Sequence, residues 1–180
     1  TYYPDTSTGY GYYSVSAKNE IILPSNVIIP NGYNNNPVKA IDQSGFDNRT
    51  EIQSVVVPDT IIAIGFSAFA NCTSLSEIDL AQSQIDRLNS KMFENCTSLT
   101  SLVVPDTVTN IINDAFLGCG NLAALEFTKE SKLRTLTYST FRATMITELQ
   151  LPFIMKGRVV TMQNKNEINI SVSFFEEIKD

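Results

Sequence analysis

The 180-residue chain contains no histidine and no tryptophan, and it has only three cysteines. Without histidine it lacks the commonest general base and the base of the usual serine and cysteine triads. The cysteines, Cys72, Cys96 and Cys119, form no C-x-x-C pair, so there is no zinc-ligand pattern of the usual kind. These absences argue against an enzyme and predict a protein that holds no metal and no cofactor.

Positive charge is also scarce, with 13 Lys and Arg against 19 Asp and Glu and a formal net charge of -6. An acidic chain is not attracted to phosphate backbones, so we expect no nucleic-acid partner. The longest apolar stretch, residues 61–70, is broken by Gly65 and Ser67, and nothing in the sequence is long enough to span a membrane. The length and the 43% hydrophobic share suit a single domain.

One sequence motif occurs twice in similar form, as FANCTSLSEIDL at residues 69–80 and as FENCTSLTSLVV at residues 93–104. A catalytic motif is seldom needed twice at a fixed interval, whereas in a repeat protein the same sequence pattern recurs in every stacked layer. Alignment on phenylalanine gives five units with separations of 23, 24, 23 and 25 residues, at Phe46, Phe69, Phe93, Phe116 and Phe141. The period therefore predicts a repeat architecture.

Each unit carries the pattern L-x-x-I-x-L, whose last positions alternate apolar and polar as in a strand with one buried face. Proline ends the run at positions 58, 105 and 152, and a second apolar pair follows. A phenylalanine and a cysteine three residues apart then share one side of a helical turn. Such a unit is stable only when stacked, and its expected structural core is the column of five phenylalanines together with Cys72, Cys96 and Cys119.

These residues resemble the BspA-like, or Treponema-type, leucine-rich repeats of bacterial surface proteins. The matching text is IQSVVVPDTIIAIGFSAFANCTS at residues 52–74 and LTSLVVPDTVTNIINDAFLGCGN at residues 99–121, and residues 27–46 resemble an atypical first repeat. The resemblance implies a leucine-rich-repeat solenoid, a β-rich right-handed coil of about five 23-residue repeats with short helical or 3-10 turns.

The resemblance also implies a domain plan and a function. We expect a linker and capping strand at residues 1–26 and repeats at residues 27–152. Residues 153–180, where the pattern lapses, are either a cap or the start of a following segment, and the cap is favoured because an open solenoid end exposes an edge and core. The implied function is a secreted or cell-surface module for adhesion, without enzymatic activity, that binds a host matrix protein, a cell-surface protein or a glycan. The alternatives are a structural spacer of a larger surface protein and a carbohydrate-active enzyme.

The third and fifth positions of each first strand are expected to face outward, because side chains alternate along a strand. These candidate binding residues are Ser54, Val56, Glu77, Asp79, Ser101, Val103, Ala124, Glu126, Glu148 and Gln150. Glu77 and Asp79 share a face, so they are also candidates for the carboxylate pair of a glycosidase or for a calcium site. The simpler interpretation is a solvated acidic strand, since the neighbouring strands offer no third carboxylate at this place.

Two further groups of residues, one basic and one of tyrosines, have both a functional and a structural interpretation. The second strands present Lys39, Arg87 and Arg134, which either orient a charged partner or are ordinary surface charge. Five of the seven tyrosines lie in residues 1–13, where they either stack on sugars or a protein partner, or belong to a cap over the first coil. The sequence favours the cap.

Overall fold

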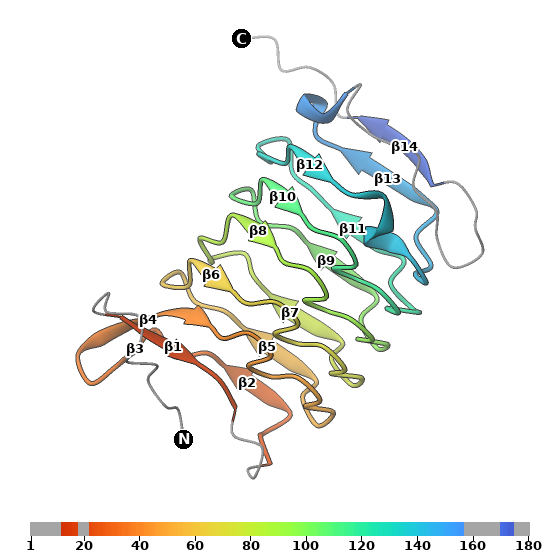
Figure 1. Cartoon of the computed structure of the whole chain (residues 1–180). Helices are drawn as coiled ribbons and strands as arrows, with labels where there is room; N and C mark the ends of the chain where they lie inside the picture. The colour runs from red at the N-terminus through yellow and green to blue at the C-terminus, as the bar shows by residue number, and fades with distance from the viewer. Residues whose placement is uncertain (1–11, 18–21, 157–169, 175–180) are drawn as a thin grey trace.

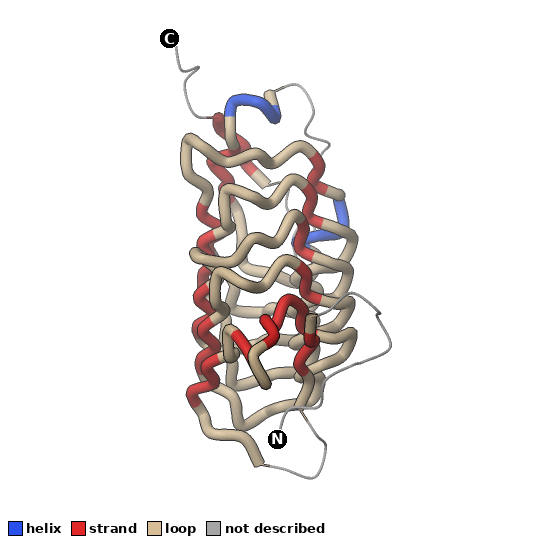
Figure 2. The backbone as a smooth tube through the Cα atoms, turned by 90° about the vertical axis from the view of Figure 1, so that its left-hand side faces the viewer, coloured by secondary structure: helices blue, strands red, loops and turns tan. Residues whose placement is uncertain are grey.

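The chain winds into a coil in which successive turns add strands to two columns (Figures 1 and 2). The computed structural model describes residues 12–17, 22–156 and 170–174. The first column holds β2 (Asn26–Ile28), β5 (Ser54–Val56), β7 (Glu77–Asp79), β9 (Ser101–Val103), β11 (Ala124–Glu126), β13 (Glu148–Leu151) and β14 (Ser171–Phe174). The second column holds β1 (Tyr13–Val15), β4 (Asn36–Ile41), β6 (Ala63–Ile64), β8 (Arg87–Leu88), β10 (Asn110–Ile111) and β12 (Thr135–Leu136).

Most neighbouring strands of a column pair in parallel and place equivalent repeat positions side by side, although among the described residues no ladder joins β6 to β8, β7 to β9 or β11 to β13. Val55 is paired with Ile78 in the β5–β7 ladder, and Leu102 is paired with Leu125 in the β9–β11 ladder. This register follows from the sequence period, because one coil advances the chain by one repeat and one interstrand spacing. The predicted repeat solenoid is confirmed.

The five phenylalanines form one stack through the interior. Each is at most 1% exposed, and neighbouring ring centroids lie 5.4, 5.9, 5.5 and 6.4 Å apart with ring planes within 11° of parallel. Backbone hydrogen bonds join the same corners, for example from the Phe69 N–H to the Met92 carbonyl and from the Phe93 N–H to the Ala115 carbonyl. The aromatic stack and the corner ladder therefore hold the coils together as one unit.

Most phenylalanine corners are hydrogen-bonded turns, and the 3-10 helices are η2 (Tyr138–Phe141) and η3 (Phe153–Met155). Left-handed residues recur in these corners, including Asn71 and Asn95, each with φ of 59°. Asparagine tolerates this conformation, and here its amide also bonds between coils. The Asn71 Nδ2 donates to Asp47 Oδ1 at 3.0 Å, and the Asn95 Nδ2 donates to Asn71 Oδ1 at 2.9 Å.

This amide ladder stops at Gly118, where φ is 75°. A Cβ atom at this position would lie 2.3 Å from the Asn95 Oδ1, so a side chain fits only if Asn95 moves. Glycine therefore meets two local demands at once, the left-handed backbone and the close approach of the preceding coil.

A strand lies beside each end of the coil. At one end β1 pairs with β4, and Val15 is fully buried; at the other end β14 pairs with β13. The domain boundaries expected from the sequence stay a prediction, because residues 1–11, 18–21, 157–169 and 175–180 lie outside the described residues. The tyrosines at positions 2, 3 and 10 belong to that group.

Candidate functional site

The outward side chains of the first column form a continuous strip, which we call the first-column face. Each strand buries its middle residue, such as Ile78 in β7 or Leu102 in β9, so the residues on either side point to solvent. The strip comprises Asn26, Ile28, Ser54, Val56, Glu77, Asp79, Ser101, Val103, Ala124, Glu126, Glu148 and Gln150. Ser54 and Ala124 are partly exposed and the others are exposed.

The first-column face combines carboxylates with exposed aliphatic side chains, and none of its residues is basic. Ile28, Val56 and Val103 are 71%, 43% and 51% exposed. Ile28 is the register partner of Val56, and Val56 is the register partner of Asp79, so apolar and acidic groups are direct neighbours. Exposed apolar side chains gathered on one face are typical of an interaction surface.

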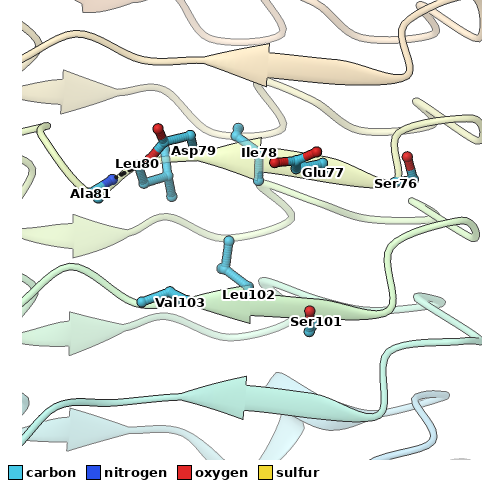
Figure 3. Close-up of a pocket in the computed structure, with 9 residues that line it drawn as sticks. All are labelled: Ser76, Glu77, Ile78, Asp79, Leu80, Ala81, Ser101, Leu102 and Val103. Carbon is cyan, nitrogen blue, oxygen red and sulfur yellow. Dashed lines mark hydrogen bonds between the residues drawn. The ribbon is translucent and has the colours of Figure 1, made fainter.

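A groove of about 510 Å³ opens on this face between β7 and β9. Figure 3 shows the two strands side by side, with Glu77 and Asp79 on β7 and Ser101 and Val103 on β9. Residues 76–81 and 101–103 line the groove. The groove is therefore acidic along one side and small or apolar along the other.

The groove lies where the hydrogen-bond ladder of the first column is interrupted. At the preceding step the Gln53 carbonyl accepts from the Ser76 and Glu77 amides at 2.9 and 3.3 Å, and at the following step the Thr100 carbonyl accepts from two amides of the next coil. Among the described residues no equivalent bond joins Ser76 to Thr100 or Ser101, and no ladder pairs β7 with β9.

Loop length accounts for the interruption. The loop from β7 to β8, residues 80–86, is one residue longer than the corresponding loops at residues 57–62 and 104–109. The extra residue changes the path of the chain between the two columns, so β7 and β9 are not held at ladder spacing. The groove thus follows the 24-residue unit, and the 25-residue unit, whose loop at residues 127–134 is longer still, likewise precedes a step without a ladder, between β11 and β13.

The two carboxylates of the groove have different surroundings. The Asp79 Oδ1 accepts a hydrogen bond from the Ala81 N–H at 2.9 Å, which ties this side chain to the corner after β7 (Figure 3). Across the groove, Ser101 and Val103 supply a single hydroxyl. A calcium ion needs six or more oxygen ligands, and within the described residues no group of three or more His, Cys, Asp or Glu is placed to hold a metal ion.

The cysteines occupy a structural column beneath the corners. The Cys72, Cys96 and Cys119 thiols are buried, form no disulfide, and donate to the carbonyls of Phe46, Phe69 and Phe93 at 3.1, 3.1 and 2.9 Å. Burial raises the pKa of Cys72 and of Cys119 to about 12, and it raises the pKa of Cys96 as well. Neutral buried thiols are poor nucleophiles, so the column is suited to packing.

The second column presents less free charge than its sequence suggests. Arg87 and Arg134 are exposed, but Arg87 donates two hydrogen bonds to Asp86, at 2.9 and 2.8 Å, and this pairing lowers the pKa of Asp86. The Lys39 Nζ lies 5.7 Å from the centroid of the Tyr12 ring. Two of the three cations are therefore engaged locally, and the first-column face is the more distinctive surface.

Sequence reasoning missed Asn26 and Ile28, which extend the first-column face by one strand. The signal was present, because VIIP at residues 27–30 corresponds to VVVP at residues 55–58. This correspondence was not used because residues 27–46 were interpreted as an atypical first repeat. The lining of the groove by Ser76 and Ala81 was also missed, since it depends on the spacing between β7 and β9.

The sequence profile of the BspA type leucine rich repeat region matches six copies within residues 39–159. No curated protein matches the sequence. In the part of the chain that the structure describes, no helix has the length and apolar character needed to cross a bilayer.

Several solved structures share the coil. A leucine rich cell surface protein from Faecalibacterium prausnitzii aligns with a TM-score of 0.62 at 24% identity over 98% of this chain and 38% of its own length. The Treponema pallidum leucine rich repeat protein gives 0.72 at 19% identity over 96% and 82% of the two chains. The pneumococcal vaccine antigen PcpA gives 0.65 at 19% identity over 89% and 41%.

The chain thus spans well under half of the Faecalibacterium protein and of PcpA, and at these identities the likeness concerns the fold. The sequence profile, by contrast, covers about two thirds of the chain and matches the units that build the phenylalanine stack. The chain belongs to the BspA type leucine-rich repeat family.

Proposed function

We propose that the chain is a non-enzymatic recognition module, secreted or displayed on a cell surface, that binds a protein partner through the first-column face. The observation that carries this proposal is the strip of exposed aliphatic and acidic side chains that surrounds the groove between β7 and β9. A partner that fits it presents apolar side chains beside lysine or arginine.

The dimensions of the strip favour a protein over a small ligand. Six strands from β2 to β13, with roughly 4.8 Å for each ladder step and more where no ladder is formed, give a surface at least about 24 Å long. A small molecule is usually enclosed in a concave pocket, whereas a protein partner covers roughly 800 Å² of a flatter surface. The groove then receives one anchoring side chain within a larger contact.

The surface location is supported by the proteins that this chain resembles. The Faecalibacterium protein is described as a cell surface protein, and PcpA is described as a pneumococcal vaccine antigen. Adhesion to a host matrix or cell-surface protein is the role that we assign to this chain on that basis.

Binding to a panel of purified extracellular-matrix proteins, measured by surface plasmon resonance, tests the proposal. We expect at least one of them to bind, and the double variant Glu77→Gln/Asp79→Asn to bind it about tenfold more weakly. The Asn side chain at position 79 retains an acceptor for the Ala81 N–H, so thermal stability should not change. Arg134→Ala, an exposed residue of the second column, is the matched control and should bind as the wild type does.

If the panel shows no binding, or the double variant binds as tightly as the wild type, the chain does not recognise its partner through this face. A spacer within a larger surface protein is then the better account.

The enzyme alternative makes a separate prediction, namely turnover of a glycan that Asp79→Asn abolishes. We expect no turnover, since Asp79 is tied to the backbone at Ala81 and its neighbours supply no acid and base pair across the groove.

A further inference from the structure

The first coil differs from the others by a β-hairpin that projects from the second column. β3 (Gly32–Tyr33) pairs antiparallel with the start of β4, and the turn residues Asn34 and Asn35 have φ of 49° and 62°. The Asn36 Nδ2 donates to the Asn34 carbonyl at 3.1 Å, and the Val38 N–H donates to the Asn31 carbonyl at 3.0 Å. The hairpin is therefore held at both its turn and its base, and Figure 1 shows it at the N-terminal end of the coil.

Tyr33 presents an aromatic ring on this hairpin. The residue is 43% exposed, and its ring packs edge-to-face with the Tyr13 ring, with centroids 5.7 Å apart and ring planes at 77°. The contact fixes the ring against β1 while leaving much of it open to solvent. An exposed, fixed aromatic ring is a preorganised platform, because little side-chain entropy is lost when a ligand stacks on it.

A hollow of about 420 Å³ lies beside this ring. Asn34, Asn35 and Asn36 line it together with Tyr33, and Thr60 reaches it from the next coil. The Thr60 Oγ1 is buried and has no hydrogen-bond partner among the described residues. The hollow thus offers asparagine amide groups next to an aromatic ring, and no lysine, arginine, aspartate or glutamate lines it.

We propose that this hairpin is a second binding site, specific for a neutral oligosaccharide. A sugar ring has an apolar C–H face that stacks on the negative face of an aromatic ring. Its hydroxyl groups act as donors and acceptors at once, and a carboxamide supplies both functions from one side chain. The hollow is open to solvent, so a ligand of one or two rings would lie across it with one side exposed.

The lining also argues against other ligands. A sulfated or sialylated glycan needs a cation, and the nearby Lys39 lies over the Tyr12 ring and is not part of the lining. An apolar peptide would leave the asparagine amides desolvated without partners, which costs free energy for each group. A neutral, hydroxyl-rich ligand satisfies both the ring and the amides.

An array of neutral oligosaccharides, printed beside sialylated and sulfated ones, tests the proposal. We expect the wild type to bind a neutral oligosaccharide and Tyr33→Ala to bind it about tenfold more weakly. Asn35→Gly removes one carboxamide while keeping a residue that favours positive φ, so it should weaken binding without disturbing the turn. Thermal melting of both variants shows whether they remain folded.

The outcome is separable from the function proposed for the first-column face. Glu77→Gln/Asp79→Asn should leave oligosaccharide binding unchanged, and added salt should not weaken it, since no charge takes part. The proposal is overturned if no neutral oligosaccharide binds, if only charged ones bind, or if folded Tyr33→Ala and Asn35→Gly bind as the wild type does.

Discussion

At the residue scale, the interior is built from columns of identical side chains, so one substitution removes contacts with two coils. Phe93 stacks on Phe69 at 5.9 Å and on Phe116 at 5.5 Å, and it is fully buried. Phe66, three residues before Phe69, is 50% exposed and takes no part in the stack. The two phenylalanines therefore differ in environment although their side chains are the same.

We predict that Phe93→Ala lowers the free energy of unfolding by about 3 to 5 kcal/mol, because it removes buried area and leaves a cavity between two rings. Phe66→Ala should change the free energy of unfolding by well under 1 kcal/mol, because substitutions at exposed positions usually change it by about 0.5 kcal/mol or less. Urea unfolding followed by circular dichroism measures both. Equal effects of the two substitutions would contradict the stacked core.

The cysteine column predicts a loss of stability at alkaline pH. In the unfolded chain a thiol ionises near its ordinary pKa of 9.0, whereas burial holds the pKa of Cys119 at about 12 in the folded protein. Between these values the unfolded state binds fewer protons than the folded state, so the free energy of unfolding falls as pH rises. At pH 10 the loss is about 1.4 kcal/mol for one such thiol.

Comparison of the wild type with Cys119→Ala at pH 7.5 and pH 10 isolates this contribution, because lysines and tyrosines titrate equally in both proteins. The variant should be less stable than the wild type at pH 7.5 and should lose about 1.4 kcal/mol less on going to pH 10. Identical losses would show that Cys119 is accessible to solvent in the folded state.

At the element scale, β7 and β9 are adjacent strands of the first column that no ladder joins, as are β11 and β13. The corners on either side of the groove remain hydrogen bonded, since the Ser67 and Phe69 amides still donate to the carbonyls of the next coil. The phenylalanine corners therefore keep the coils in register at a step where no ladder joins the two strands.

Hydrogen exchange of backbone amides tests this interruption. We predict that the Thr100 and Ser101 amides exchange faster than the Ser76 and Glu77 amides, which occupy the same positions one coil earlier and donate to the Gln53 carbonyl. Residue-resolved exchange followed by NMR makes the comparison within one protein. Equal protection of the two pairs would mean that β7 and β9 are joined by a ladder after all.

The repeat made most of the architecture predictable from sequence. Once Phe69 and Phe93 are aligned, the alternation in each strand decides which residues are buried, and the structure places Ile78 and Leu102 inside accordingly. The groove was not predictable in the same way. One extra residue in the loop at positions 80–86 is visible in the sequence, but its effect depends on how the whole coil accommodates the change in path.

The hairpin of the first coil shows a similar limit. The run NGYNNN at residues 31–36 carries turn residues, yet the pattern does not say that the Tyr33 ring contacts Tyr13 from a strand some twenty residues earlier. Such a contact depends on β1 lying next to β4, a pairing between segments that share no repeat motif. Local periodicity predicts columns, whereas these additions depend on tertiary packing.

At the scale of the whole molecule, the coil presents surfaces of different chemistry on one rigid scaffold. The first-column face is acidic and aliphatic, the second column carries Arg87 paired with Asp86, and the hairpin carries an aromatic ring among amides. In a stacked array each coil contacts its neighbours, so exposed positions can differ from coil to coil while the buried columns stay constant. This division allows recognition to vary without loss of the fold.

The central claim is that recognition takes place on the first-column face, and an NMR titration tests it most directly. The ¹⁵N-labelled chain is titrated with the matrix protein that binds in the panel. We predict that the largest changes in amide signals fall on β5, β7, β9 and β11, around Glu77 and Val103. Changes confined to the second column, to the phenylalanine corners or to the hairpin would contradict the account.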